Sequence, residues 1–427
     1  MVRPIPRALS PCYDERMARA FEDGRSLPAR SLALYFDYTC PFAYLGSTQA
    51  RALAERMGVT LEYKPILLGG IFKAVNTPQD LMSSLGPAKA AHNAADMMRW
   101  AKRWKQPLVM PPNHPMRSVE ALRATIATGI DPNVIDAFYR MYWVENRPIS
   151  AREVIREVIS NCGYDSEKVL FDIETPPLKD DLRARTDEAL ERGVFGVPTW
   201  LVDGEHLYWG QDRLAFVEGV RPEPRAPAAV KKEKTLEVYW DFSSPFAYLA
   251  STQIEKIAAR TGAKVVWKPV LLGGLFRAIG TPDVPLATFS EAKRQHVDDD
   301  LYRWAAYWGV PFEFPSRFPT RSLDALRVWL ALPEAQRAYF QASVFRAYWA
   351  EDKDITDRSV LAACIGDPSI VQRTLQRASS DDVKHELRAS TEAAVARGVF
   401  GVPTFVVGDD LFWGQDRLEL VEEALVS

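Results

Sequence analysis

The feature that most constrains the fold is an internal repeat of whole-domain length. Residues 35–45, YFDYTCPFAYL, return at residues 239–249 as YWDFSSPFAYL, an offset of 204. Three more segments recur in the same order: KPILLGG at 64–70 as KPVLLGG at 268–274, GVFGVPT at 193–199 and again at 398–404, and YWGQDRL at 208–214 as FWGQDRL at 412–418. Solenoid repeats have periods of about 20–50 residues. The sequence therefore predicts a tandem duplication of one complete domain.

The domain boundaries follow from the repeats and from composition. We expect domain 1 at residues 31–220 and domain 2 at residues 235–427, because a chain of 427 residues exceeds what one core usually supports. Residues 221–234 are rich in proline and lysine and read as a linker. Residues 1–30 form an N-terminal arm without the apolar run of a signal peptide or membrane span, so we expect a cytoplasmic protein with no membrane partner.

We expect the same order of strands and helices in both copies. In the first, residues 32–38 favour a strand, residues 41–57 a helix opened by a proline, and residues 61–67 a second strand. Residues 199–202 and 206–209 read as a hairpin, followed by a closing helix at 211–220. Helical insertions are expected at about 77–192 and 281–397. The order β-α-β, helical insertion, β-β-α predicts an α/β domain with a small sheet and a helical subdomain.

Composition excludes several classes of function. The chain has 53 basic and 56 acidic residues, so it lacks the positive charge of a nucleic-acid-binding protein. Its four cysteines include no CxxC pair, and no cluster has the spacing of a metal site. His92 and His296 are equivalent in the two copies, but each is expected to be solvated or locally hydrogen-bonded. The expected partner is a small molecule.

Cys40 and Ser244 occupy equivalent positions before the proline that opens a helix. Free backbone N–H groups and the helix dipole favour negative charge there, so the pKa of Cys40 is expected to be lowered and the thiol to be nucleophilic. The Ser244 hydroxyl is suited to donate to a thiolate brought by another molecule. The structural alternatives are an N-cap for Ser244 and a small buried hydrophobe for Cys40.

Two further motifs point to a peptide-like ligand. If the Val-Pro bonds at 197–198 and 402–403 are cis, the valine backbone can pair with an extended ligand; a trans proline at the start of a strand is the alternative. Asp212 and Asp416 lie near helix N-termini. They either complement the dipole or, with free amides beside them, hold the carboxylate and ammonium of an amino acid.

The ordered motifs together resemble the 2-hydroxychromene-2-carboxylate isomerases and kappa-class glutathione transferases, in the DsbA-like branch of the thioredoxin superfamily. The resemblance covers nearly the whole chain, twice. It implies a thioredoxin-like fold with an all-helical insertion and glutathione as cofactor. By the same resemblance, Ser244 contacts the glutathione sulfur and the helical insertion covers the acceptor site. The other residues implied to bind glutathione are Val197, Pro198, Gln211 and Asp212 in copy one, and Val402, Pro403, Gln415 and Asp416 in copy two.

The sequence departs from that family at three places. Cys40 replaces the serine, and Ala43 stands where a resolving cysteine would be, which excludes dithiol oxidation. Thr77 and Thr281 lie near the place of a glutathione-binding Asn. Arg117 and its copy Arg321 replace a frequent Asn, so the acceptor pocket is expected to differ.

The function that the resemblance implies is isomerisation of an unsaturated aromatic pyruvate by reversible addition of glutathione thiolate. Cations for the substrate carboxylate, each equally readable as a solvated surface charge, are Lys268, Arg277 and Arg321, with Lys64, Lys73 and Arg117 in copy one. One alternative is a monothiol glutathione transferase or thiol-disulfide oxidoreductase that uses Cys40. Another is a non-catalytic scaffold. The duplication also suggests a monomer whose halves pack like the subunits of a homodimer.

Overall fold

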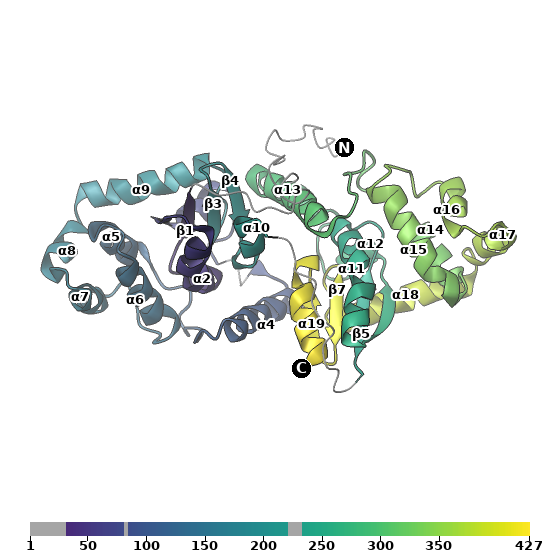
Figure 1. Cartoon of the computed structure of the whole chain (residues 1–427), viewed down its shortest axis with the longest axis horizontal. Helices are drawn as coiled ribbons and strands as arrows, with labels where there is room; N and C mark the ends of the chain where they lie inside the picture. Colours follow the sequence, from purple (N-terminus) through teal and green to yellow (C-terminus); the bar gives the residue numbers. More distant parts are fainter. Residues whose placement is uncertain (1–30, 81–83, 221–232) are drawn as a thin grey trace. The chain divides into compact units, whose positions relative to one another are not determined.

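The computed structural model describes residues 31–80, 84–220 and 233–427 (Figure 1). The expected N-terminal arm and most of the expected linker lie outside these residues. The described chain divides into two compact units, the first holding β1–β4 and the second holding β5–β8. Gly86–His92 groups with the second unit, and Ser290–Asp299 groups with the first.

Each unit has one four-stranded sheet with the same topology. In the first, β1 (Leu32–Phe36) pairs parallel with β2 (Leu61–Pro65) and antiparallel with β3 (Thr199–Val202), which pairs with β4 (His206–Trp209). The order is β2-β1-β3-β4. The second sheet repeats this as β6-β5-β7-β8, built from β5 (Thr235–Trp240), β6 (Lys264–Pro269), β7 (Thr404–Val407) and β8 (Asp410–Trp413). The expected β-α-β and β-β-α segments are confirmed.

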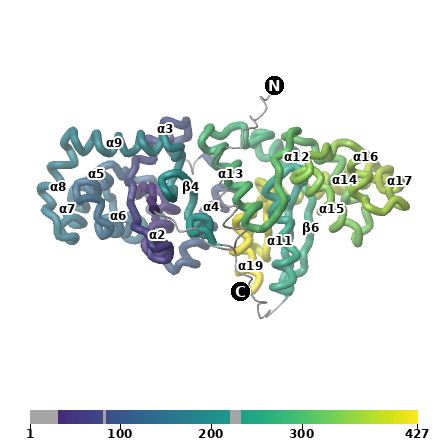
Figure 2. Tube along the Cα trace, turned by 45° about the horizontal axis from the view of Figure 1, so that its top comes forward, coloured from purple at the N-terminus to yellow at the C-terminus, as the bar shows by residue number. Residues whose placement is uncertain are grey.

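Helices cover the sheets and form the insertions (Figures 1 and 2). Figure 1 shows α5–α8 grouped beyond the end of the first sheet, with α9 leading back to β3. The helices of the first repeat are α2 (Pro41–Met57), α3 (Leu68–Ala74), α4 (Pro87–Arg103), α5 (Val119–Ala127), α6 (Pro132–Trp143), α7 (Arg152–Asn161), α8 (Ser166–Asp172), α9 (Pro176–Glu191), the 3₁₀ turn η2 (Gln211–Arg213) and α10 (Leu214–Glu218). Those of the second repeat are α11 (Pro245–Thr261), α12 (Leu272–Ala278), η3 (Pro285–Thr288), α13 (Glu291–Trp308), α14 (Leu323–Ala331), α15 (Glu334–Trp349), α16 (Arg358–Ile365), α17 (Pro368–Arg377), α18 (Asp381–Ala396), η4 (Gln415–Arg417) and α19 (Leu418–Val426).

Local sequence signals account for the ends of α2. Pro41 stands at the first helical position, where its missing N–H costs no hydrogen bond. Gly58 ends the helix in the left-handed conformation with φ of 66°, which glycine adopts without a steric penalty. The helix therefore begins directly after Cys40 and places that side chain at its N-terminus.

The helical insertion of each unit is anchored on the turn before the first helix. The indole Nε1 of Trp143, the last residue of α6, donates to the carbonyl oxygen of Tyr38 at 2.8 Å. Trp349, the last residue of α15, donates in the same way to Phe242 at 2.8 Å. Both indoles are fully buried. The insertion is thus held against the turn that carries Cys40 or Ser244.

Three expected boundaries differ from the structure. The first strand ends at Phe36 and not at residue 38. The second strand ends at Pro65 because the next residues turn into α3, whose Leu68 N–H donates to the Asp37 carboxylate at 2.8 Å. The closing helix begins as the 3₁₀ turn η2 before α10. Among the described residues, no helix combines the length and apolar character that crossing a bilayer requires.

Candidate functional site

The turn that precedes each first helix is built around a buried aspartate. Asp37 accepts hydrogen bonds from the backbone of Thr39 at 3.0 Å and of Leu68 at 2.8 Å, and from the side chain of Ser118. Asp241 repeats this arrangement with the backbone of Ser243 and Leu272 and the side chain of Ser322. Burial raises the pKa of both carboxyl groups, and these hydrogen bonds oppose the rise. Each carboxylate therefore joins the turn, the start of the next helix and the insertion.

Ser244 is buried at the N-terminus of α11 and makes two hydrogen bonds. Its Oγ accepts from the backbone N–H of Ala247 at 3.1 Å, so the N-cap interpretation is correct. The same hydroxyl donates its hydrogen to the carbonyl oxygen of Val402 at 3.0 Å. The serine thus connects the helix N-terminus to the Val-Pro loop, and its hydrogen is directed at that loop.

Cys40 has the same position at the start of α2 but a different bonding pattern. Its Sγ donates to the carbonyl oxygen of Val197 at 3.1 Å, and it makes no side-chain cap hydrogen bond. Desolvation raises the pKa of Cys40 to about 12, although the amides of Ala43 and Phe42 lower it. The expected lowering of the Cys40 pKa is therefore wrong for the protein without ligand, because burial outweighs the helix terminus.

The Val-Pro loops have the cis geometry that the peptide-ligand hypothesis required. The bonds Val197–Pro198 and Val402–Pro403 are both cis. The sequence did not lead us to expect two further cis bonds, His114–Pro115 and Phe318–Pro319. In each unit the loop runs directly into an inner strand of the sheet, β3 or β7. The loop thus lies where the thiol or hydroxyl reaches its carbonyl.

Close packing explains the glycine before each Val-Pro pair. A Cβ on Gly196 would lie 2.8 Å from the indole Nε1 of Trp209, and one on Gly401 would lie 2.6 Å from that of Trp413. Both distances are too short for any larger residue without movement. Each tryptophan directly precedes the Gly-Gln-Asp turn, so it packs the Val-Pro loop against that turn.

In the Gly-Gln-Asp turn, the aspartates that we expected to bind a ligand already have partners. Asp212 forms an ion pair with its neighbour Arg213 at 3.0 Å, and Asp416 forms one with Arg417 at 3.2 Å. Gln211 is 3% exposed, and its amide nitrogen has no hydrogen-bond partner in the described part of the chain. Buried polar atoms are usually satisfied. The Gln211 amide is therefore the group in this turn that a bound ligand would satisfy.

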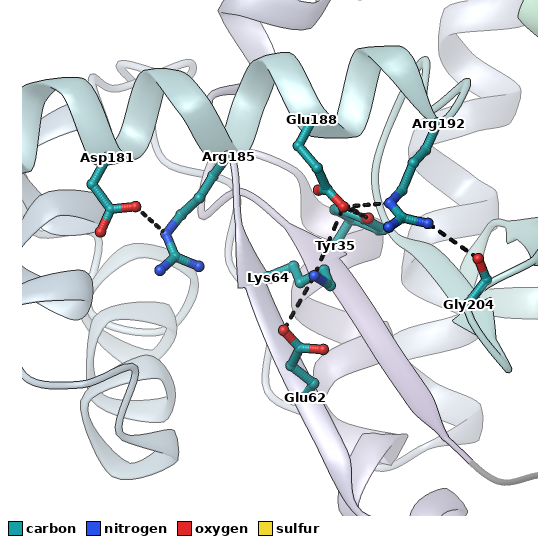
Figure 3. Close-up of polar contacts among 8 residues, drawn as sticks. All are labelled: Tyr35, Glu62, Lys64, Asp181, Arg185, Glu188, Arg192 and Gly204. Carbon is teal, nitrogen blue, oxygen red and sulfur yellow. Dashed lines mark hydrogen bonds and ion pairs between the residues drawn. The ribbon is translucent and has the colours of Figure 1, made fainter.

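The cation expected at Lys64 is already neutralised within the first unit. Its ammonium lies 3.1 Å from Glu62 and 3.9 Å from Glu188 on α9, as Figure 3 shows. Tyr35 also donates to Glu188 at 3.2 Å, and Arg192 pairs with the same carboxylate. Farther along α9, Asp181 pairs with Arg185. Lys64 therefore braces α9 against the sheet.

The equivalent cation in the second unit lacks those partners. Lys268 is partly buried, and Val266 and Ala393 stand where the first repeat has Glu62 and Glu188. The other two candidates of that repeat are on separate elements and exposed. Arg277 lies in the last turn of α12, and Arg321 is 74% exposed and 3.8 Å from Asp324. Among the described residues, Lys268 and Arg277 have no ion-pair partner, and of these two only Lys268 is partly buried.

The equivalent histidines are buried, so the expectation of solvated side chains is wrong. His92 groups with the second unit, where its Nε2 accepts a hydrogen bond from the Trp413 backbone at 3.1 Å. His296 groups with the first unit and packs against the rings of Phe195 and Trp209. The hydrogen bond of His92 joins it to a residue 321 positions away in the sequence, so it is not the local bond that we expected.

Sequence reasoning missed a polar pair on the insertion side of the first turn. The Nδ1 atom of His114 lies 3.0 Å from the hydroxyl of Tyr142, which also accepts from the Met116 backbone at 2.7 Å. The alignment of the two repeats could have drawn attention to His114, because this residue aligns with Phe318 although the prolines near it are the same in both copies.

Comparison with known proteins identifies the fold family. A family model described as a DSBA-like thioredoxin domain matches residues 31–220 and again residues 235–426. The chain belongs to the DsbA-like thioredoxin family. Among the curated relatives are the 2-hydroxychromene-2-carboxylate isomerases of Pseudomonas putida, 33% identical over 195 residues, and of Sphingobium xenophagum, 31% identical over 203 residues. Human glutathione S-transferase kappa 1 is 26% identical over 205 residues.

Each of these relatives aligns with about half of the present chain. The three alignments cover 44%, 45% and 44% of the chain and 93%, 99% and 89% of the respective relatives. A solved 2-hydroxychromene-2-carboxylate isomerase structure has 31% identity and a TM-score of 0.40, covering 45% of this chain and 94% of that one. One relative thus corresponds in length to one repeat, and the chain is related to isomerases and glutathione transferases.

Proposed function

We propose that the chain is a glutathione-dependent isomerase of the 2-hydroxychromene-2-carboxylate isomerase type, acting on an unsaturated aromatic small molecule at the second unit. The observation that carries the proposal is the Ser244 hydroxyl. It lies at the N-terminus of α11, and its hydrogen points to the carbonyl of Val402 in the cis Val-Pro loop. A donor at a helix N-terminus stabilises a sulfur anion placed beside it.

The other motifs of that unit fit a thiol tripeptide. The Val402–Pro403 loop is suited to pair its backbone with an extended cysteinyl residue. Gln415 is 3% exposed in the turn before α19, and with Asp416 it is suited to receive the γ-glutamyl end. Bound glutathione would supply a thiolate that adds reversibly to an electron-poor carbon, permits bond rotation and leaves unchanged. Lys268 is our candidate for the substrate carboxylate, because it is partly buried and has no acidic partner in the part of the chain that the structure describes.

The role of Ser244 follows from its two hydrogen bonds. Its Oγ is held by the Ala247 amide, so the oxygen stays in place while the hydrogen is free to rotate. When a thiolate lies beside the turn, the hydrogen turns from the Val402 carbonyl to the sulfur. Hydrogen bonds to a charged acceptor contribute about 1.5–3 kcal/mol. Ser244 thereby lowers the pKa of the bound thiol without itself ionising.

Cys40 fits the same role in the first unit better than it fits a monothiol mechanism. With its pKa raised to about 12, the side chain is protonated at neutral pH and donates its hydrogen to Val197. The thiolate is the nucleophilic form of cysteine. These contacts favour Cys40 as a thiol donor equivalent to Ser244, with Val197, Pro198, Gln211 and Asp212 as the glutathione-binding residues of the first unit.

Calorimetric titration with glutathione tests the proposal. The intact chain, Ser244→Ala, Cys40→Ser and the double variant Cys40→Ser/Ser244→Ala are compared at neutral pH. We expect Ser244→Ala to weaken binding in one unit and to raise the pKa of the bound thiol, seen by thiolate absorbance. Cys40→Ser is the matched control, since it gives the first unit the hydroxyl of the second and should retain binding. Absence of glutathione binding in all four proteins would refute the proposal and favour a scaffold.

A further inference from the structure

The two units share one frame around the turn but differ in a segment of the insertion that borders it. Residues 107–118 of the first repeat align with residues 311–322 of the second. Near one end the segment is fixed by a backbone hydrogen bond, from Val109 to Trp143 at 2.8 Å and from Glu313 to Trp349 at 2.7 Å. At the other end the side chain of Ser118 bonds to Asp37, and that of Ser322 bonds to Asp241. The backbone frame is therefore the same in both units.

Seven positions of this segment differ between the repeats, and three of them hold phenylalanine in the second repeat only. In the second repeat they are Phe312, Phe314 and Phe318, whose rings lie 5.9–6.2 Å from that of Trp349. In the first repeat the same positions hold Leu108, Met110 and His114. The segment is thus an aromatic cluster in the second unit, whereas the first unit has one imidazole there.

The hydrogen bonds of Tyr142 favour one tautomer of His114. The Tyr142 oxygen accepts from the Met116 N–H, and its own hydrogen can donate to the His114 Nδ1, which lies 3.0 Å away. With Nδ1 accepting, the ring hydrogen of the uncharged imidazole is on Nε2. Burial lowers the pKa of His114, which keeps it uncharged at neutral pH. Within the described chain, Nε2 makes no hydrogen bond, and the side chain is only partly buried.

Tyr142 also places His114 on the Cys40 side of the insertion. Tyr142 lies in the last turn of α6, and Ser118, four residues after His114, bonds to Asp37 in the turn that carries Cys40. The adjacent Trp143 contacts the same turn through Tyr38 and lies 5.2 Å, centroid to centroid, from the His114 ring.

We propose that His114, oriented by Tyr142, donates a hydrogen bond to the carbonyl oxygen of an acceptor that reacts beside Cys40 in the first unit. The second unit has Phe318 at the same position and therefore lacks this donor. The proposal rests on the glutathione chemistry proposed above and names its acceptor class, an α,β-unsaturated carbonyl compound. Phe318 instead offers ring contacts, so the two units prefer different acceptors.

The chemical step is balanced without a further reactant. As the sulfur–carbon bond forms, the π pair of the C=C bond shifts to the bond between the α-carbon and the carbonyl carbon, and the C=O π pair moves to the oxygen, which then carries negative charge; the former double bond is now single and can rotate. The Nε2–H of His114 donates to that oxygen and keeps its proton. When the sulfur–carbon bond breaks, the pair returns to form the double bond in its new geometry. A donor that meets charge only in the transition state accelerates the reaction by about 10²–10³-fold.

The activity test uses the full chain with Ser244→Ala in the background, so that the first unit dominates. His114→Phe introduces the residue that the second unit carries in the same frame, so it is expected to fold. We expect kcat for glutathione-dependent isomerisation of an arylidene pyruvate to fall by about 10²-fold, with little change in KM. His114→Gln keeps an N–H donor and should restore part of the rate. Cys162→Ser, after the last residue of α7, is the control and should leave this rate unchanged.

The pH profile separates a donor from a merely structural residue. The groups that act on His114 are Asp80, whose charge raises its pKa, and Tyr142, whose hydroxyl lies 3.0 Å from Nδ1. Protonation of Nδ1 breaks its acceptance from Tyr142. The rate is therefore expected to fall as the pH drops below the normal histidine range, and His114→Gln should lack this acidic limb. An unchanged kcat and profile in His114→Phe would overturn the proposal.

A second readout does not depend on glutathione. Imidazole ¹⁵N NMR should show His114 with its hydrogen on Nε2, and a saturated aryl keto acid, which cannot react, should shift the Nε2 resonance. That shift should vanish in Tyr142→Phe if Tyr142 orients the ring. A shift without any glutathione activity would support the donor role while refuting the proposed isomerase. Hydrogen on Nδ1, or no shift with saturating keto acid, would refute the donor role even in an active enzyme.

Discussion

Replacing Cys40 by serine should stabilise the start of α2, because the two units show what the position gains. Ser244 accepts a hydrogen bond from the Ala247 amide at 3.1 Å, whereas Cys40 makes no such cap bond in the same turn. Both side chains donate to the carbonyl of the following cis Val-Pro loop. Cys40→Ser therefore adds one cap and removes no hydrogen bond. A side-chain N-cap contributes about 1 kcal/mol.

The measurement is local, since a chain of two units need not unfold in one step. Amide hydrogen exchange at Ala43 should slow by about fivefold in Cys40→Ser, the factor that about 1 kcal/mol implies. The melting temperature of the first unit should rise by about 2–4 °C. The reverse substitution, Ser244→Cys, should accelerate amide hydrogen exchange at Ala247 by a similar factor.

A control separates capping from a general effect of exchanging thiol for hydroxyl. Cys162 is partly buried after the last residue of α7, so Cys162→Ser should leave exchange at Ala43 unchanged. Faster exchange at Ala43 in Cys40→Ser, with a lower melting temperature, would refute the reasoning. That result would mean that packing of the larger sulfur outweighs the cap.

Three other variants or titrations test separate parts of the site. The rate of Cys40 alkylation by iodoacetamide should keep rising with pH beyond the normal thiol range, because burial raises its pKa to about 12; a plateau near neutral pH would contradict this. Gly196→Ala should destabilise the first unit by about 1–3 kcal/mol in denaturant unfolding, since the new Cβ would lie 2.8 Å from the Trp209 indole; equal stability would show that the loop moves freely. Glu188→Gln should lower the pKa of Tyr35 in an ultraviolet titration, because the carboxylate adds to the rise that burial causes, and it should cost less than about 1 kcal/mol of stability since the pair is partly exposed; an unchanged Tyr35 pKa would refute that contact.

Local signals made much of the scaffold predictable. The helix at 41–57 and the strands at 199–202 and 206–209 match the structure to the residue. Pro41 and Gly58 define the helix ends, and Asp203 and Gly204 both adopt positive φ in the hairpin turn between the strands. These features depend on the conformational preferences of a few adjacent residues. The repeat then doubled the information, because each motif appeared twice in the same order.

The electrostatics of the site could not be predicted in the same way. The helix terminus favours a thiolate at Cys40, but the burial that raises the pKa arises from packing of the whole unit. The ion pair that neutralises Lys64 joins β2 to Glu188 on α9, and the contact of His114 with Tyr142 joins a loop to the end of α6. Such contacts depend on tertiary packing, which neither hydrophobic periodicity nor motif spacing reports.

The likeness of the two frames makes each unit a structural control for the other. The hydrogen bonds around Asp37 and Asp241 correspond, as do those of Trp143 and Trp349. A side chain moved from one unit to the same position in the other therefore enters the same backbone frame, so a change in chemistry can be assigned to that side chain. The differences are concentrated at the reacting turn and the segment beside it. If the units had kept one reaction, exchanging Phe318 and His114 would alter neither acceptor preference nor pH profile, whereas divergence of the two sites requires that both change together.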